Sequence, residues 1–195
     1  MRRVALLGAT GSIGASTLDV LERNPEQFEA FALAAGRNAA AMREACQRVT
    51  PRYAVMQDED AAEELAAGLA ADGLADRITV RSGDEAVAEV AAHPEADQVV
   101  AGIVGAAGLH SALAAVRAGK TLLLANKECL VMAGALFMAE AQAGGATVIP
   151  VDSEHNAVFQ VMPAQGQSGV ERIHLTASGG PFRDRDPATL ATVTP

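Results

Sequence analysis

The sequence predicts an α/β fold built on a doubly wound, mainly parallel sheet, and three observations lead to this prediction. A glycine-rich turn follows the first apolar run, short β-rich runs alternate with longer alanine-rich runs, and the alternation stops near residue 151. Strands that alternate with helices form parallel sheets with helices on both faces. We therefore expect a Rossmann-like domain over residues 1–150, followed over residues 151–195 by the start of a second, α+β domain.

The glycine-rich turn lies in the stretch VALLGATGSIG at residues 4–14, which reads as a strand, a turn and the start of a helix. Gly8 permits a tight turn, Gly11 lets the backbone approach a pyrophosphate, and Gly14 lets the helix pack against the strand. Phosphates bind at the N-termini of such helices, and the turn adds two hydroxyl donors, Thr10 and Ser12. The spacing is GxxGxxG and not GxGxxG, so an ordinary glycine turn is the alternative. Its position between strand and helix favours a nucleotide.

The other elements follow in order along the chain. The expected strands are Val4 to Leu7, Phe28 to Ala35, Tyr53 to Met56, Ile78 to Arg81, Gln98 to Ala101, Thr121 to Leu124 and Ala146 to Val151. The expected helices are Ser12 to Arg23, Ala39 to Val49, Asp60 to Ala71, Gly83 to Ala92, Leu109 to Ala118 and Glu128 to Ala143. Beyond them we expect a helix near His155 to Met162, a strand near Glu171 to Ala177 and a helix that starts at Pro187.

The composition excludes several classes of protein. Half of the 195 residues are hydrophobic and 20% are charged, which is enough apolar material for a core. The formal net charge of −9 argues against a nucleic acid or an anionic membrane as the partner. Neither a signal peptide nor a membrane-spanning run is present, so we expect a cytoplasmic protein. The two cysteines, Cys46 and Cys129, lack CxxC spacing and are expected to be buried small hydrophobes.

The end of the second strand carries the first clue to a specific cofactor. In a dinucleotide fold this position usually holds an acid that binds the ribose 2′-hydroxyl, but here the chain reads Gly36, Arg37 and Asn38. A guanidinium at this place suits a 2′-phosphate, so the sequence predicts NADPH over NADH. The alternative is a solvated Arg37 beside an Asn38 that caps the next helix.

Two further segments follow strands whose carboxyl ends meet the same edge. Gly102 to Gly108 is a second turn of small residues, and Asn126, Lys127 and Glu128 follow the strand that ends at Leu124. Asn126 as an N-cap with a solvated first turn is the alternative. A lysine at a helix N-terminus opposes the helix dipole, however, so Lys127 calls for an anionic partner.

The sequence after the seventh strand offers carboxylates for a metal. If the chain is extended there, Asp152 and Glu154 point the same way, and hard oxygen ligands suit Mg²⁺ or Mn²⁺. A capped helix start, with Ser153 as N-cap, explains the same residues equally well. Further along, Thr176 to Phe182 ends in a hydroxyl and glycines that could close on a phosphate, although an ordinary turn explains this stretch at least as well.

Taken in order, the motifs GATGSIG, AGRN, AGIVGAAGL, LLANKE, VDSEHNA and LTASGGPFR resemble the 1-deoxy-D-xylulose 5-phosphate reductoisomerase family over essentially the whole chain. The resemblance implies an NADP-dependent oxidoreductase and isomerase of the non-mevalonate isoprenoid pathway. Such an enzyme uses NADPH and Mg²⁺ or Mn²⁺, with Co²⁺ as a further candidate, to convert 1-deoxy-D-xylulose 5-phosphate to 2-C-methyl-D-erythritol 4-phosphate. It also implies a homodimer and assigns residues 151–195 to the start of a catalytic domain that binds metal and substrate.

The resemblance assigns roles residue by residue. The NADPH positions are Thr10, Gly11, Ser12, Ile13, Gly36, Arg37, Asn38, Asn126 and Glu128. The substrate positions are Lys127, Ser153, Glu154 and Ser178, the metal ligands are Asp152 and Glu154, and the catalytic residues are Lys127, Asp152 and Glu154.

The chain departs from the family in length. Family members continue for about as long again, and that part supplies a third acidic metal ligand, a lid and a C-terminal helical domain. We therefore expect the N-terminal half of the enzyme, which keeps the cofactor site but turns over weakly or not at all. The alternative is an NADPH-binding regulatory module without catalysis. A short-chain dehydrogenase does not fit, because Tyr53 is followed at the fourth position by Gln57, and a semialdehyde dehydrogenase would lack an acyl-site partner for Cys129.

Overall fold

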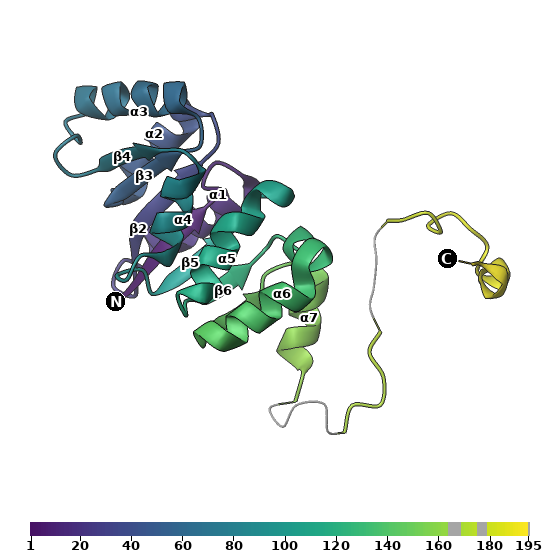
Figure 1. Cartoon of the computed structure of the whole chain (residues 1–195). Coiled ribbons are helices and arrows are strands. Elements are labelled where there is room, and N and C mark those ends of the chain that lie inside the picture. The colour runs from purple at the N-terminus through teal and green to yellow at the C-terminus, as the bar shows by residue number, and fades with distance from the viewer. Residues whose placement is uncertain (164–168, 175–178, 195) are drawn as a thin grey trace. The chain divides into compact units, whose positions relative to one another are not determined.

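The computed structural model describes residues 1–163, 169–174 and 179–194. The chain divides into two compact units, Met1–Asp152 and Ser153–Pro195, each of which is described by itself. The first unit is a seven-stranded sheet in the order β4-β3-β2-β1-β5-β6-β7, and every neighbouring pair is parallel. The predicted α/β, doubly wound fold is confirmed (Figure 1).

The bounds of the elements are as follows. The strands are β1 (Arg2–Leu7), β2 (Phe28–Ala35), β3 (Tyr53–Met56), β4 (Thr79–Ser82), β5 (Gln98–Ala101), β6 (Thr121–Leu124) and β7 (Thr147–Pro150). The helices of the first unit are α1 (Ser12–Arg23), α2 (Ala39–Val49), α3 (Glu59–Ala71), α4 (Asp84–Ala92), the 3-10 helix η1 (Ala106–Gly108), α5 (Leu109–Arg117) and α6 (Glu128–Gly144). The second unit contains α7 (Ser153–Val161) and the 3-10 helix η2 (Pro187–Thr192).

Helices cover both faces of the sheet because successive strand residues point to opposite sides. In β1, Val4 and Leu6 belong to a core cluster that includes side chains of α1, α2 and α3. Ala5 and Leu7 belong to a second cluster, which includes side chains of α4, α5 and α6. Both faces of the central strands are therefore buried, which explains why these strands are almost continuously apolar in sequence.

The sequence predicted the elements of the first unit closely. All seven strands form, α1 and α2 have the predicted bounds, and the other four predicted α-helices differ by one residue at one end. Periodicity was a reliable guide here because parallel strands and their covering helices have strongly contrasting patterns.

The second unit differs from its prediction in three respects. Residues 171–174 do not form the expected strand, and the rest of that segment lies outside the described residues. The helix expected near His155 begins earlier, at Ser153, and the helix expected at Pro187 is a 3-10 helix. With a Pro at its start, this short element is capped by the Asp186 carboxylate, which accepts from Ala188 N at 3.0 Å.

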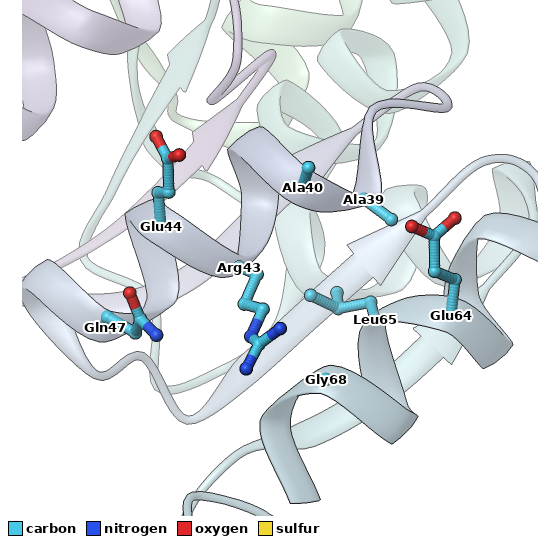
Figure 2. A pocket seen from close by; sticks show the side chains of 8 residues that line it. All are labelled: Ala39, Ala40, Arg43, Glu44, Gln47, Glu64, Leu65 and Gly68. Atoms are coloured by element: carbon cyan, nitrogen blue, oxygen red, sulfur yellow. The ribbon is translucent and has the colours of Figure 1, made fainter. Parts of the chain in front are cut away.

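The surface between α2 and α3 forms a pocket of about 300 Å³ (Figure 2). Figure 2 shows Arg43 pointing from α2 toward α3, beside Gly68. Arg43 Nε and Nη2 donate to the two carboxylate oxygens of Asp72 at 2.7 and 2.5 Å. A Cβ at Gly68 would lie 2.9 Å from Arg43 Cδ, so the glycine leaves room for the arginine side chain to cross the surface of α3. Arg43 thus lines the pocket and also forms the ion pair with Asp72 at the end of α3.

Two expectations from composition can be compared with the structure. Cys46 and Cys129 are buried and free, as predicted, and burial raises the pKa of the Cys46 thiol to about 12. Among the described residues, no helix has the length and apolar character that crossing a membrane requires.

Candidate cofactor site

The glycine turn after β1 lies where the loops of three neighbouring strands meet. Gly8 has φ +88°, and a Cβ there would lie 2.8 Å from the carbonyl carbon of Gly102, at the end of β5. Gly8 N and Ala9 N both donate to Ala34 O of β2 at 2.8 Å, and Gly102 N donates to Leu7 O at 2.8 Å. Strand order reverses between β1 and β5, and ligands of open α/β sheets bind at the carboxyl ends of the strands at such a reversal.

The other two glycines of the turn meet different constraints. A Cβ at Gly14 would lie 2.3 Å from Ala9 O, so α1 packs against the turn only because this residue is glycine, as predicted. A Cβ at Gly11 would lie 3.4 Å from Gly8 O, and its backbone is extended, with φ −89° and ψ 179°. No contact among the described residues requires glycine at position 11, so a ligand can approach the backbone there.

The N-terminus of α1 is suited to an anion. Gly11 is the N-cap, no side chain caps the helix, and no acidic residue lies in the first turn. By contrast, α3 is capped by a carboxylate and has acidic residues in its first turn. Helix α4 has acids in its first turn without a side-chain cap, whereas α5 resembles α1 in having neither. The predicted ligands of this turn are exposed or half-buried: Thr10, Gly11, Ser12 and Ile13. Open N–H groups without a competing carboxylate are what a phosphate needs.

The loop after β2 carries the residues predicted to select the cofactor. The Arg37 side chain is 86% exposed, and its Nε lies 3.0 Å from Asp58 Oδ2. Asn38 caps α2, because its Oδ1 accepts from Ala41 N at 3.0 Å, so the capping interpretation of Asn38 is confirmed. Gly36 is half-buried beside them. A guanidinium thus extends into solvent at the end of β2, where a 2′-phosphate would lie in a dinucleotide fold.

Asn126 has a role that sequence reasoning missed. It is only 2% exposed, and its Nδ2 donates to Ile103 O at 2.6 Å and to Gly105 O at 2.9 Å. The side chain therefore holds the loop between β5 and η1, and its Oδ1 has no hydrogen-bond partner among the described residues. The small residues of the loop from Gly102 to Gly108 could have indicated this role. They leave backbone carbonyl groups accessible to a side chain at the end of the next strand.

The helix that follows Asn126 starts differently from the alternative considered above. Lys127, and not Asn126, is the N-cap of α6, and Glu128 is its exposed first residue. Lys127 Nζ donates to Asp152 Oδ2 at 2.9 Å. The anionic partner that the position of Lys127 called for is thus present within the chain, just after β7.

The two predicted metal ligands fall in different units of the structure, Asp152 at the end of the first unit and Glu154 in α7 of the second. The assumption of an extended chain is wrong for Glu154, because α7 already begins at Ser153. Ser153 Oγ donates to Glu154 Oε2 at 3.0 Å. No group of three or more His, Cys, Asp or Glu side chains suited to a metal occurs in the described part of the chain. The remaining predicted substrate residue, Ser178, lies outside the described residues.

Comparisons with known proteins point to one enzyme family. A family model described as 1-deoxy-D-xylulose 5-phosphate reductoisomerase matches residues 4–134, and a model of the C-terminal domain of the same enzyme matches residues 148–195. The 1-deoxy-D-xylulose 5-phosphate reductoisomerase of Aromatoleum aromaticum is 55% identical over 201 aligned positions, which cover 100% of this chain and 49% of that protein. The chain thus spans about half the length of this relative.

Solved structures give the same result. The reductoisomerase from Zymomonas mobilis in complex with NADPH has a TM-score of 0.87 and 46% identity, over 100% of this chain and 50% of that one. A DOX-P reductoisomerase in complex with magnesium has a TM-score of 0.88 and 39% identity, with the same coverage.

Proposed function

Because the chain belongs to the 1-deoxy-D-xylulose 5-phosphate reductoisomerase family, we propose that it carries the NADPH site of such an enzyme. The reaction is the rearrangement and reduction of 1-deoxy-D-xylulose 5-phosphate to 2-C-methyl-D-erythritol 4-phosphate, with NADPH and a divalent metal, Mg²⁺ or Mn²⁺. The Zymomonas mobilis relative was solved with NADPH and another relative with magnesium, which supports both cofactors.

One observation carries the proposal: the N-terminus of α1 opens at the reversal of strand order without a side-chain cap or an acid in its first turn. The pyrophosphate binds there, on the amides that follow Gly11. Arg37 meets the 2′-phosphate at the end of β2. The buried Asn126 orders the loop beside the site, and its Oδ1 offers an acceptor that has no partner in the described residues. The nicotinamide, when bound, supplies the hydride that reduces the rearranged sugar phosphate.

The remaining predicted roles belong to the metal and substrate. Asp152 and Glu154 are the proposed metal ligands, and Lys127, Ser153, Glu154 and Ser178 the proposed substrate ligands. Lys127 balances the Asp152 charge, with its Nζ 2.9 Å from Oδ2.

The length of the relatives indicates which functions this chain can carry. The matched relatives have about twice as many residues, since this chain covers 49% of one and 50% of others. We infer that the residues of this chain are sufficient to bind the cofactor. Turnover, and the homodimer expected for the family, also need the additional residues that the longer relatives have.

Oxidation of NADPH, followed by its absorbance in the presence of 1-deoxy-D-xylulose 5-phosphate and Mn²⁺, tests this division. NADPH binding with little or no turnover supports it. Turnover that Asp152→Asn abolishes would show that the chain is a complete catalyst. The second candidate, a regulatory module that binds NADPH without catalysis, predicts the same binding without turnover. It requires that Mn²⁺ leave NADPH binding and substrate binding unchanged.

A further inference from the structure

Asp58 lies at the end of β3 and connects three parts of the fold with different atoms. Its Oδ1 accepts from Ala61 N at 3.1 Å, which caps α3. Its Oδ2 lies 3.0 Å from Arg37 Nε. Its backbone N donates to Gly36 O at 3.4 Å. The two carboxylate oxygens therefore have different partners: one caps the N-terminus of α3, and the other contacts the exposed arginine of the neighbouring loop.

The contact uses the inner edge of the guanidinium. Nε is the guanidinium nitrogen nearest to the carboxylate, 3.0 Å from Asp58 Oδ2. The Asp58 side chain is 28% exposed and is fixed by its cap, whereas the Arg37 side chain is 86% exposed. The helix cap leaves the carboxylate little freedom, so a well-held acid contacts an exposed base.

We propose that Asp58 is a positioning residue that sets the preference for NADPH over NADH by holding Arg37 ready for the 2′-phosphate. The inference rests on the proposed cofactor site. A guanidinium binds phosphate best through two parallel N–H groups, and the Nε contact with Asp58 leaves the terminal nitrogens for this purpose. Asp58 itself does not touch the cofactor.

Two effects of the carboxylate oppose one another. It orders Arg37, which would otherwise lose much rotamer freedom when a ligand fixes it. It also offsets part of the positive charge that attracts the phosphate. Both effects arise from one exposed ion pair, so salt weakens both, and the proposal holds that the ordering effect is the larger of the two.

Asp58→Asn separates the two functions of the side chain. Asparagine is as good an N-cap as aspartate, so its Oδ1 keeps the bond to Ala61 N, but the charge facing Arg37 is removed. The expected result is a dissociation constant for NADPH that rises about two- to fivefold, the range that exposed ion pairs allow, with the constant for NADH unchanged. Titration of the 195-residue chain by fluorescence of the reduced nicotinamide measures both constants.

Three controls give the result its meaning. Glu22→Gln removes the ion pair with Arg48, which joins α1 and α2 away from Arg37, and should leave both constants unchanged. Arg37→Ala should abolish the preference for NADPH. In that background Asp58→Asn should have no further effect, because the interaction that it disrupts is already absent. A merely structural role of Asp58 would change both constants in either background.

The outcomes distinguish the two levels of the proposal. If Asp58→Asn leaves the ratio of the two constants unchanged or tightens NADPH binding, the positioning role is wrong. If Arg37→Ala leaves the preference intact, or the parent chain has none, the assignment of Arg37 fails, and the role of Asp58 fails with it.

Discussion

Lys127 Nζ lies 2.9 Å from Asp152 Oδ2, between the segments that follow β6 and β7. The Asp152 side chain is only 9% exposed, and Lys127 is the N-cap of α6, where a positive charge opposes the helix dipole. Lys127 therefore neutralises a carboxylate that is largely removed from water, and Asp152 neutralises a positive charge that the helix dipole disfavours. A cation already contacts the carboxylate that we propose as a metal ligand.

Lys127→Gln should consequently tighten the binding of Mn²⁺ at Asp152. A divalent cation and an ammonium group 4 Å apart in water repel by about 2 kcal/mol, which is about thirtyfold in affinity. Free Mn²⁺ can be counted by electron paramagnetic resonance during a titration of the chain. Lys120→Gln is the control, because Lys120 Nζ contacts a backbone carbonyl, Pro94 O. Unchanged affinity in Lys127→Gln, or full affinity in Asp152→Asn, would contradict the proposed role of Asp152.

Gly11→Ala and Gly14→Ala should separate cofactor binding from folding. A Cβ at Gly14 would lie 2.3 Å from a backbone oxygen, so this variant should lose about 3 kcal/mol or more of unfolding free energy. A Cβ at Gly11 lies 3.4 Å from its nearest neighbour. Gly11→Ala should change stability by less than about 1 kcal/mol while weakening NADPH about tenfold or more. Urea unfolding and NADPH titration of both variants check this, and equal losses of stability would refute it.

Asn126→Asp should destabilise the first unit although the two side chains have the same shape. The carbonyl oxygens of Ile103 and Gly105 accept from Asn126 Nδ2, and a carboxylate would place a negative oxygen against both. We expect a loss of about 1 to 3 kcal/mol in unfolding free energy, the range for a buried polar group left unsatisfied.

Asn24→Asp is the matched control for this change. Asn24 Nδ2 also donates to a backbone carbonyl, Val20 O at 2.8 Å, but at an exposed site. Its expected loss is below about 1 kcal/mol. If the two variants unfold at the same urea concentration, burial of the Asn126 amide has no energetic consequence and its role in the loop is wrong.

The ion pair between Arg43 and Asp72 should make stability depend on acidity. The hydrogen bonds from Arg43 lower the pKa of Asp72 from 3.8 to about 2. A lowered pKa in the folded state stabilises the protein above the unfolded pKa, and the gain is lost as pH falls from about 4 toward 2. The difference in Tm between the parent chain and Arg43→Gln should therefore be full at pH 5 and shrink toward pH 2.

Arg23→Gln, which removes an exposed pair with Asp19 within α1, serves as the comparison for Arg43→Gln. Its effect on Tm should be small at every pH. A difference for Arg43→Gln that stays constant down to pH 2 would show that the pair does not lower the pKa of Asp72.

The sequence predicted the first unit well because hydrophobic pattern, turn residues and helix-start residues all indicated the same elements. Apolar runs, glycine positions and helix starts agreed for the stretch around Gly8 to Gly14, and the family resemblance followed from the same residues. Two features escaped prediction because they depend on contacts between distant segments. Asn126 bonds to a loop 21 to 23 residues earlier, and Asp58 contacts Arg37 across a strand and a helix.

Local patterns failed where two conformations compete. Asp152 to Glu154 fits either an extended chain or a helix start, and α7 begins at Ser153. The stretch after Glu171 had the composition of a strand, but residues 171–174 form none. An isolated strand needs a neighbour to satisfy its backbone groups, and the local pattern does not reveal whether a neighbour exists.

The most direct test of the account is a titration of the chain with NADPH and with NADH, followed by the fluorescence of the reduced nicotinamide. The account predicts saturable binding of one NADPH per chain, about tenfold or more tighter than NADH, and its loss in Gly11→Ala without loss of the fold. Absence of saturable NADPH binding by the folded chain, or equal affinity for the two nucleotides, would contradict it.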